Sequence, residues 1–92
     1  MKVPYDKSKD KIEAYNLAKK VINKKYLSKW NIDIDVNCDG EKHTISANGK
    51  GFDMEIKFLH DHCKAELKLS FLLRAFQGKF EGIIKEELEK NL

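Results

Sequence analysis

The sequence predicts an α+β fold of two layers, in the order helix, four strands, helix. Apolar residues recur every three or four positions near the N-terminus, alternate with polar residues through the middle of the chain, and return to helical spacing toward the C-terminus. These two changes of period predict a four-stranded antiparallel meander between two helices. Because one sheet face is apolar and the other charged, we expect both helices to cover the apolar face.

The first helix is expected over residues 10–28, after Pro4 and a polar stretch. Asp10, followed three residues later by Glu13, is a variant of the capping box that begins helices. The apolar face of this helix consists of Ala14, Leu17, Ala18, Val21 and Ile22. We expect the helix to end near Ser28, with Trp30 closing the connection to the sheet.

Four antiparallel strands are expected between residues 31 and 69, because apolar and polar residues alternate there. The apolar residues of the four strands are Ile32, Ile34 and Val36; Ile45 and Ala47; Phe52, Met54, Ile56 and Phe58; and Cys63, Ala65, Leu67 and Leu69. Three turns join them, near Gly40, Gly49–Gly51 and His60–His62. In the first turn, Asp39-Gly40 tolerates the positive φ that tight hairpins need.

The last helix is expected to run from an N-cap at Ser70 nearly to Leu92. One helical face holds Phe76, Phe80, Ile83, Ile84 and Leu88. Gly78 and Gly82 weaken such a helix by about 1 kcal/mol each relative to alanine. We interpret them as small residues that let the helix lie close to the sheet.

Length and composition indicate a single domain over residues 1–92. The chain is 41% hydrophobic and 36% charged, which excludes a disordered protein. It has no run of about 18 apolar residues that could span a membrane and no signal peptide. Two cysteines outside any C-x-x-C motif are therefore expected to be reduced thiols, and the expected location is cytoplasmic.

The first 30 residues carry nine lysines and three acidic residues, a net charge of +6. The cluster of Lys19, Lys20, Lys24 and Lys25 could contact nucleic acid or another polyanion. However, Arg74 is the single arginine, and arginine is the usual reader of bases and bidentate ligand of phosphates. We therefore favour a solvated helix face and disfavour nucleic acid, with the polyanion-binding module kept as the alternative function.

Five metal-ligating residues flank the first and third turns, which lie at the same end of a meander. They are Cys38, His43, His60, His62 and Cys63. Their types suit zinc, but their spacing matches no zinc signature. We predict no metal and no cofactor, and keep a small metal-binding protein as a second alternative.

Catalytic motifs are missing from the sequence. None of the serines lies in a G-x-S-x-G context, and no order of Cys, His and acidic residues indicates a nucleophile with its base. Gly49-x-Gly51 lacks the third glycine and the helix of a nucleotide-binding loop. We therefore predict that the protein is not an enzyme.

The run Phe71-Leu72-Leu73-Arg74-Ala75-Phe76 has more large apolar side chains than one helix face can bury. Phe76, with either Leu72 or Leu73, is expected to enter the core. Consecutive residues of a helix point about 100° apart, so at least one of Phe71, Leu72 and Leu73 should be exposed or covered by a second subunit. The candidate interaction surface is Phe71, Leu72, Leu73 and Arg74.

The same segment carries a family resemblance. The stretch from Leu67 to Phe80, LKLSFLLRAFQGKF, resembles bacterial proteins of the polyhydroxyalkanoic acid system family, which are short and share this strand, Phe-Leu-Leu, Phe junction. The resemblance begins at Gly49 and covers roughly half the chain. The family pattern also has a short strand-like segment with a histidine before the first helix, whereas Val3 to Lys11 contain no histidine.

The resemblance implies a role around the granules of a bacterial storage polymer or in its regulation, and supplies no catalytic residues. The expected function is thus a non-enzymatic accessory or interaction protein. The expected partner is a protein or a granule surface, and a homodimer is allowed.

Overall fold

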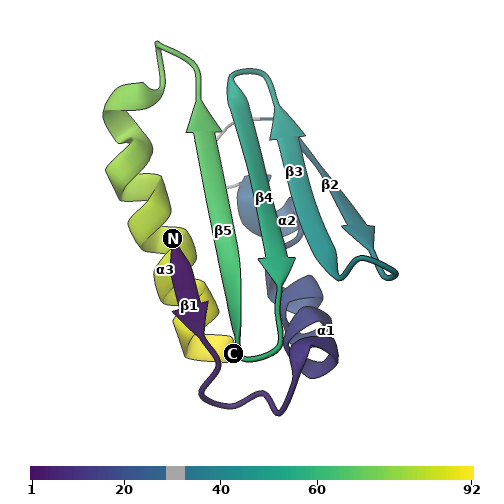
Figure 1. Cartoon of the computed structure of the whole chain (residues 1–92). Helices are drawn as coiled ribbons and strands as arrows, with labels where there is room; N and C mark the ends of the chain where they lie inside the picture. The colour runs from purple at the N-terminus through teal and green to yellow at the C-terminus, as the bar shows by residue number, and fades with distance from the viewer. Residues whose placement is uncertain (29–32) are drawn as a thin grey trace.

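The computed structural model describes residues 1–28 and 33–92, which form two layers (Figure 1). The strands are β1 (Lys2–Pro4), β2 (Ile34–Asp39), β3 (Thr44–Gly49), β4 (Phe52–Phe58) and β5 (His62–Leu69). The helices are α1 (Lys11–Val21), α2 (Lys24–Ser28) and α3 (Gln77–Asn91), and a 3₁₀ turn, η1 (Arg74–Phe76), precedes α3. Residues 29–32, which include Trp30 and the predicted start of the first strand, lie outside the described residues.

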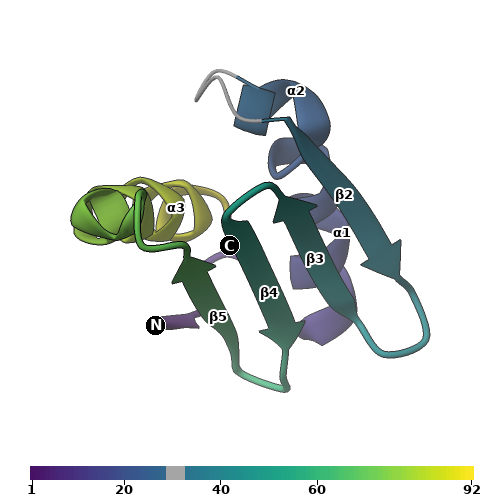
Figure 2. The same ribbon diagram turned by 90° about the horizontal axis from the view of Figure 1, so that it is seen from above.

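The strands form one antiparallel sheet in the order β1-β5-β4-β3-β2. The helices lie on one side of this sheet, and its other side is open (Figure 2). The predicted α+β class, the antiparallel meander β2–β5 and the placement of the helices on one face are confirmed. The predicted number of strands is wrong, since the sheet has five.

The core lies between the sheet and the helices. Along β4, every second residue from Phe52 to Phe58 is buried, as the alternation predicts. Helix α1 packs on β3 and β4 through the buried Ala14 and Ala18, and α3 packs on β1 and β5 through Ile84 and Leu88. Burying each large apolar side chain contributes roughly 1.5–3 kcal/mol, so this shared face stabilises the fold.

The additional strand, β1, pairs with β5 and places Val3 opposite Cys63. With three residues, of which only Val3 is buried, β1 is too short for an alternation to mark it in the sequence. Pro4 fits because β1 is an edge strand, where the missing N–H is not needed by a further neighbour. This strand occupies the position of the short segment that precedes the first helix in the family pattern.

The predicted first helix is two helices. Its N-cap is confirmed, because Asp10 Oδ1 accepts a hydrogen bond from Glu13 N at 3.0 Å. The helix ends early because Asn23 satisfies the backbone of both pieces: its Nδ2 donates to Lys20 O at 2.9 Å, and its Oδ1 accepts from Tyr26 N at 2.9 Å. Such local side-chain bonds compete with the helix, so α2 begins as a separate turn.

The hairpin between β2 and β3 differs from the tight Asp-Gly turn that was predicted. The positive φ lies at His43, at 52°, and not at Gly40. Asp39 Oδ1 instead accepts hydrogen bonds from the N–H groups of Glu41 and Lys42 at 3.0 and 3.1 Å. This Asx-type arrangement supports a wider loop over residues 40–43.

The last helix begins at Gln77 and not after a cap at Ser70, because turns and η1 occupy residues 71–76. The interpretation of the helix glycines is also wrong. A Cβ atom added at Gly78 or Gly82 would meet nothing within 4 Å, so neither glycine is needed for a close approach to the sheet.

The end of α3 is tied to the loop that follows β1. The backbone oxygen of Leu92 accepts hydrogen bonds from the N–H groups of Asp6, Lys7 and Ser8 at 3.0, 2.7 and 2.8 Å. The Leu92 side chain is itself fully buried. These contacts join segments from opposite ends of the sequence to one core.

Candidate interaction surface

The segment 70–76 connects β5 to α3 through a chain of backbone hydrogen bonds. Ser70 N donates to Gly51 O at 2.9 Å, which ties the segment to the β3–β4 turn. Leu73 N then donates to Ser70 O at 3.0 Å, and Phe76 N donates to Leu73 O at 2.9 Å. The apolar side chains here are therefore presented by a hydrogen-bonded backbone.

Two of these apolar side chains point almost entirely into solvent. Phe71 is 85% exposed and Leu72 is 84% exposed, whereas Leu73 packs against the core. The prediction that at least one of the three is exposed is confirmed, and Leu73 is the one that turns inward. The prediction that Phe76 enters the core is wrong, because 50% of it is exposed. We call Phe71, Leu72 and Phe76 the apolar tip.

The Phe76 ring belongs to a chain of aromatic contacts that leads into the core. Its ring stacks on Phe80 with centroids 6.3 Å apart, and Phe80 meets the buried Phe52 edge-on, also at 6.3 Å. Gln77 holds the adjoining helix end to the sheet, since its Nε2 donates to Leu67 O at 3.3 Å. Phe76 is therefore connected to the core through aromatic contacts, and the start of α3 beside it is hydrogen-bonded to the sheet.

Two basic residues lie close to the apolar tip in the sequence, and a third lies in the turn to which the segment is bonded. Arg74, which belongs to the predicted interaction surface, lies between Leu72 and Phe76 in sequence and is exposed. Lys79 is exposed in the first turn of α3, and Lys50 is exposed in the β3–β4 turn to which Ser70 is bonded. Sequence reasoning missed Lys50 and Lys79 as neighbours of this surface, because their proximity depends on the turn and on the start of α3.

The lysines of the predicted polyanion site are spread over α1 and α2. Lys19 and Lys20 are exposed in α1, and Lys25 is exposed in α2. The Lys19 Nζ lies 4.9 Å from the centroid of the Tyr15 ring, a cation–π contact that gives this lysine a structural role. Lys24 belongs to α2, and its side chain lies outside the described part of the structure.

The predicted ligand residues lie near one end of the sheet without converging. Among residues 1–28 and 33–92, no three His, Cys, Asp or Glu side chains are placed to hold a metal ion. Cys38 is exposed, whereas Cys63 is fully buried. His43 packs edge-on against the Tyr15 ring with centroids 5.5 Å apart, and His60 is exposed in the β4–β5 turn.

Two groups near the β4–β5 turn have perturbed acidities. Burial raises the pKa of the Cys63 thiol to about 11, so this thiol is neutral and poorly nucleophilic at neutral pH. His62 Nδ1 lies 2.5 Å from Asp61 Oδ1, and this hydrogen bond lowers the pKa of the Asp61 carboxyl. Because the Cys63 side chain is buried on the helix side of the sheet, the thiol has no access to a substrate.

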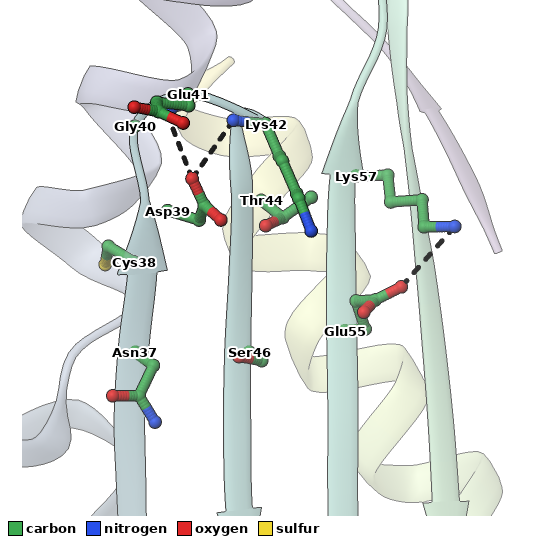
Figure 3. Close-up of a pocket in the computed structure, with 10 residues that line it drawn as sticks. All are labelled: Asn37, Cys38, Asp39, Gly40, Glu41, Lys42, Thr44, Ser46, Glu55 and Lys57. Carbon is green, nitrogen blue, oxygen red and sulfur yellow. Dashed lines mark hydrogen bonds and ion pairs between the residues drawn. The ribbon is translucent and has the colours of Figure 1, made fainter.

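The open face carries a wide depression of about 870 Å³ beside the β2–β3 hairpin (Figure 3). Its lining is polar, and two of the lining residues of strand β4 form an ion pair, with Lys57 Nζ 3.6 Å from Glu55 Oε1. The carboxylate of Asp39 is directed at the loop N–H groups, as the dashed lines in Figure 3 show. The depression thus consists of solvated strand side chains and a loop-capping carboxylate.

The register of the sheet also produces a row of lysines on the open face. Lys64 in β5 lies directly opposite Lys2 in β1 on one side and Lys57 in β4 on the other. Directly opposite like charges destabilise a sheet, so this row lowers stability, and the Glu55 carboxylate 3.6 Å from Lys57 offsets part of that cost. Sequence reasoning missed it because only the strand register brings these lysines into line.

Within the described residues, no helix has the length and apolar character needed to cross a membrane. Residues 5–92 match the family model described as "Putative polyhydroxyalkanoic acid system protein (PHA_gran_rgn)". No match was found among curated proteins or among solved structures. The match includes both the first helical region and the Phe-Leu-Leu junction, so it extends beyond the half of the chain that carried the resemblance. The chain therefore belongs to the family of polyhydroxyalkanoic acid system proteins.

Proposed function

We propose that this protein is a non-enzymatic, cytoplasmic accessory protein of the polyhydroxyalkanoate storage system, and that it contacts the granule surface through the apolar tip. The observation that carries the proposal is the exposure of Phe71 and Leu72, at 85% and 84%. Neighbouring large apolar side chains with so little cover are typical of an interaction site. The family supports the partner, because a storage polyester offers an apolar surface.

The contacts around the apolar tip support a binding role for it. Leu73 and Phe80 pack against the core and hold the segment, while Phe71 and Leu72 add little to the packing of the chain itself. Burying a phenylalanine or leucine side chain contributes roughly 1.5–3 kcal/mol, so two of them could anchor the protein to an apolar surface. Because the tip's backbone is already hydrogen-bonded, little conformational entropy is lost on contact.

Two features support a role without catalysis. The buried cysteine is held as a neutral thiol, and because successive residues of a strand point to opposite faces, His62 and the Cys63 thiol lie on opposite sides of β5. The depression on the open face contains solvated polar groups, and catalytic groups usually need a drier and more enclosed site.

The test is co-sedimentation of the protein with amorphous poly(3-hydroxybutyrate) particles. We expect the wild-type protein to bind and the double variant Phe71→Ser/Leu72→Ser to lose binding. Ile12→Ser is the matched control, because Ile12 is also an exposed apolar residue, at 53%, but lies in α1. Equal binding by the wild type and the double variant would overturn the proposal.

The polyanion alternative predicts no binding to the uncharged polyester and predicts binding to DNA instead. Binding through α1 would be lost in Lys19→Gln/Lys20→Gln and would weaken steeply with added salt. Apolar contact through the tip would survive added salt.

A further inference from the structure

The residues around the apolar tip are basic to an extent that a neutral polyester does not explain. From Leu67 to Phe80 the sequence contains Lys68, Arg74 and Lys79 but no acidic residue. Lys50 adds a positive charge from the β3–β4 turn. A neutral polymer surface offers these cations no counter-charge.

The acidic residues closest in the sequence to Lys50 and Lys79 form hydrogen bonds with neutral amide side chains. Glu81 Oε1 accepts a hydrogen bond from Gln77 Nε2 at 3.0 Å, and Asp53 Oδ1 accepts one from Asn48 Nδ2 at 2.9 Å. Asp53 also lies opposite Lys68 across the β4–β5 pair, so Lys68 has a counter-charge on the sheet. The rim that remains consists of Lys50, Arg74 and Lys79, which form no ion pair with any residue in the ranges 1–28 and 33–92.

We propose that the apolar tip is an interfacial anchor for an anionic lipid surface, in which Phe71, Leu72 and Phe76 enter the apolar layer and Lys50, Arg74 and Lys79 meet the headgroups. An apolar centre within a basic rim matches the two chemical layers of such a surface. The inference deepens the proposed function and rests on its use of the tip. It specifies that the surface reached is coated with anionic lipid.

The shape and charge of the tip argue against two other occupants. A second copy meeting tip to tip would bring two basic rims together, which costs electrostatic energy at low salt. A protein groove for a helix would require apolar anchors at helical spacing along an exposed helix face. Here Phe71 and Leu72 are consecutive residues in turns, and only Phe76 adjoins a helix.

Binding of the full chain to two kinds of vesicle tests the inference. One kind contains phosphatidylcholine alone, and the other contains phosphatidylcholine with phosphatidylglycerol. We expect binding to the anionic vesicles and little binding to the neutral ones. Added salt should reduce the difference between them, because exposed charges are screened within about 10 Å at moderate ionic strength.

Variants separate the apolar and electrostatic parts. Phe71→Ser should lower the partition coefficient by about tenfold or more. Arg74→Gln and Lys79→Gln should each lower it by about fivefold on anionic vesicles and leave binding to polyester particles unchanged. Lys20→Gln is the matched control, since it removes the same charge from an exposed position of α1 and should have little effect.

The outcomes distinguish this inference from the proposed function. Binding to bare polyester particles but not to anionic vesicles would overturn the inference and leave the proposed function standing. Equal losses in Arg74→Gln and Lys20→Gln would mean that net charge and not the tip drives vesicle binding, and would also overturn the inference. Association of the free protein that Phe71→Ser abolishes, without vesicle binding, would identify a second copy as the occupant.

Discussion

Gly82 offers a direct test of how α3 is packed. It lies inside α3, with three or more helical residues on each side, and a Cβ atom placed there would meet nothing within 4 Å. Glycine in a helix interior costs about 1 kcal/mol relative to alanine, chiefly through backbone entropy. Because no contact is displaced, Gly82→Ala should recover most of that free energy. For a domain of about 60–100 residues, this corresponds to a rise in melting temperature of roughly 4–8 °C.

The measurement is thermal unfolding by far-UV circular dichroism, with the free energy of unfolding checked in urea. Gly51→Ala is the matched control. Gly51 has φ of +77°, and a Cβ there would lie 2.6 Å from Ser70 Oγ, so the same substitution should destabilise the protein. A lower melting temperature for Gly82→Ala would refute the reasoning, because it would show that another surface, such as a second subunit, closely covers this face of α3.

Four further predictions concern other parts of the structure. Leu73→Ala should lower the free energy of unfolding by roughly 2 kcal/mol or more, because Leu73 packs against the core. Leu72→Ala should leave the melting temperature nearly unchanged, because Leu72 is exposed. A large loss of stability in both variants would show that the segment is only core. Lys64→Glu should raise the free energy of unfolding by up to about 1 kcal/mol at low salt, because it converts two opposed lysine pairs into pairs of opposite charge. An equal gain at high salt would contradict this electrostatic explanation. In the native protein, Cys38 should react rapidly with Ellman's reagent and Cys63 only on unfolding. The raised pKa of Cys63, about 11, also predicts that stability falls as the pH rises from about 9 toward 11, and Cys63→Ala should reduce that slope.

Much of the fold could be predicted because its signals are local. The alternation from Phe52 to Phe58 is visible in consecutive residues and does not depend on any distant contact. The Asp10 cap is equally local, since its bond spans three residues. The break between α1 and α2 was missed although its cause is also local: the apolar pattern continues across it, and Asn23 bonds the backbone on both sides.

The candidate site was predicted in part. Steric reasoning about consecutive residues predicted that at least one of Phe71, Leu72 and Leu73 would be exposed, but not which. The hydrogen bond from Ser70 to Gly51 and the following turns decide that Leu73 packs inward. The same turns delay the start of α3 to Gln77, and Phe76 is consequently left half-exposed.

The sequence by itself determined the class of fold, the apolar face of each main strand and the family, because each is written in residues that are close together in the chain. Tertiary structure alone decided the features that join distant segments. Strand β1 exists because Val3 can pair opposite Cys63, and the lysine row exists because three strands are in register. The basic rim of the tip likewise needs the β3–β4 turn to lie beside Ser70. The physical reason is the same for all three features. Each depends on contacts between residues that are distant in the sequence, and the periodicity of apolar residues along the chain does not specify which distant residues become neighbours.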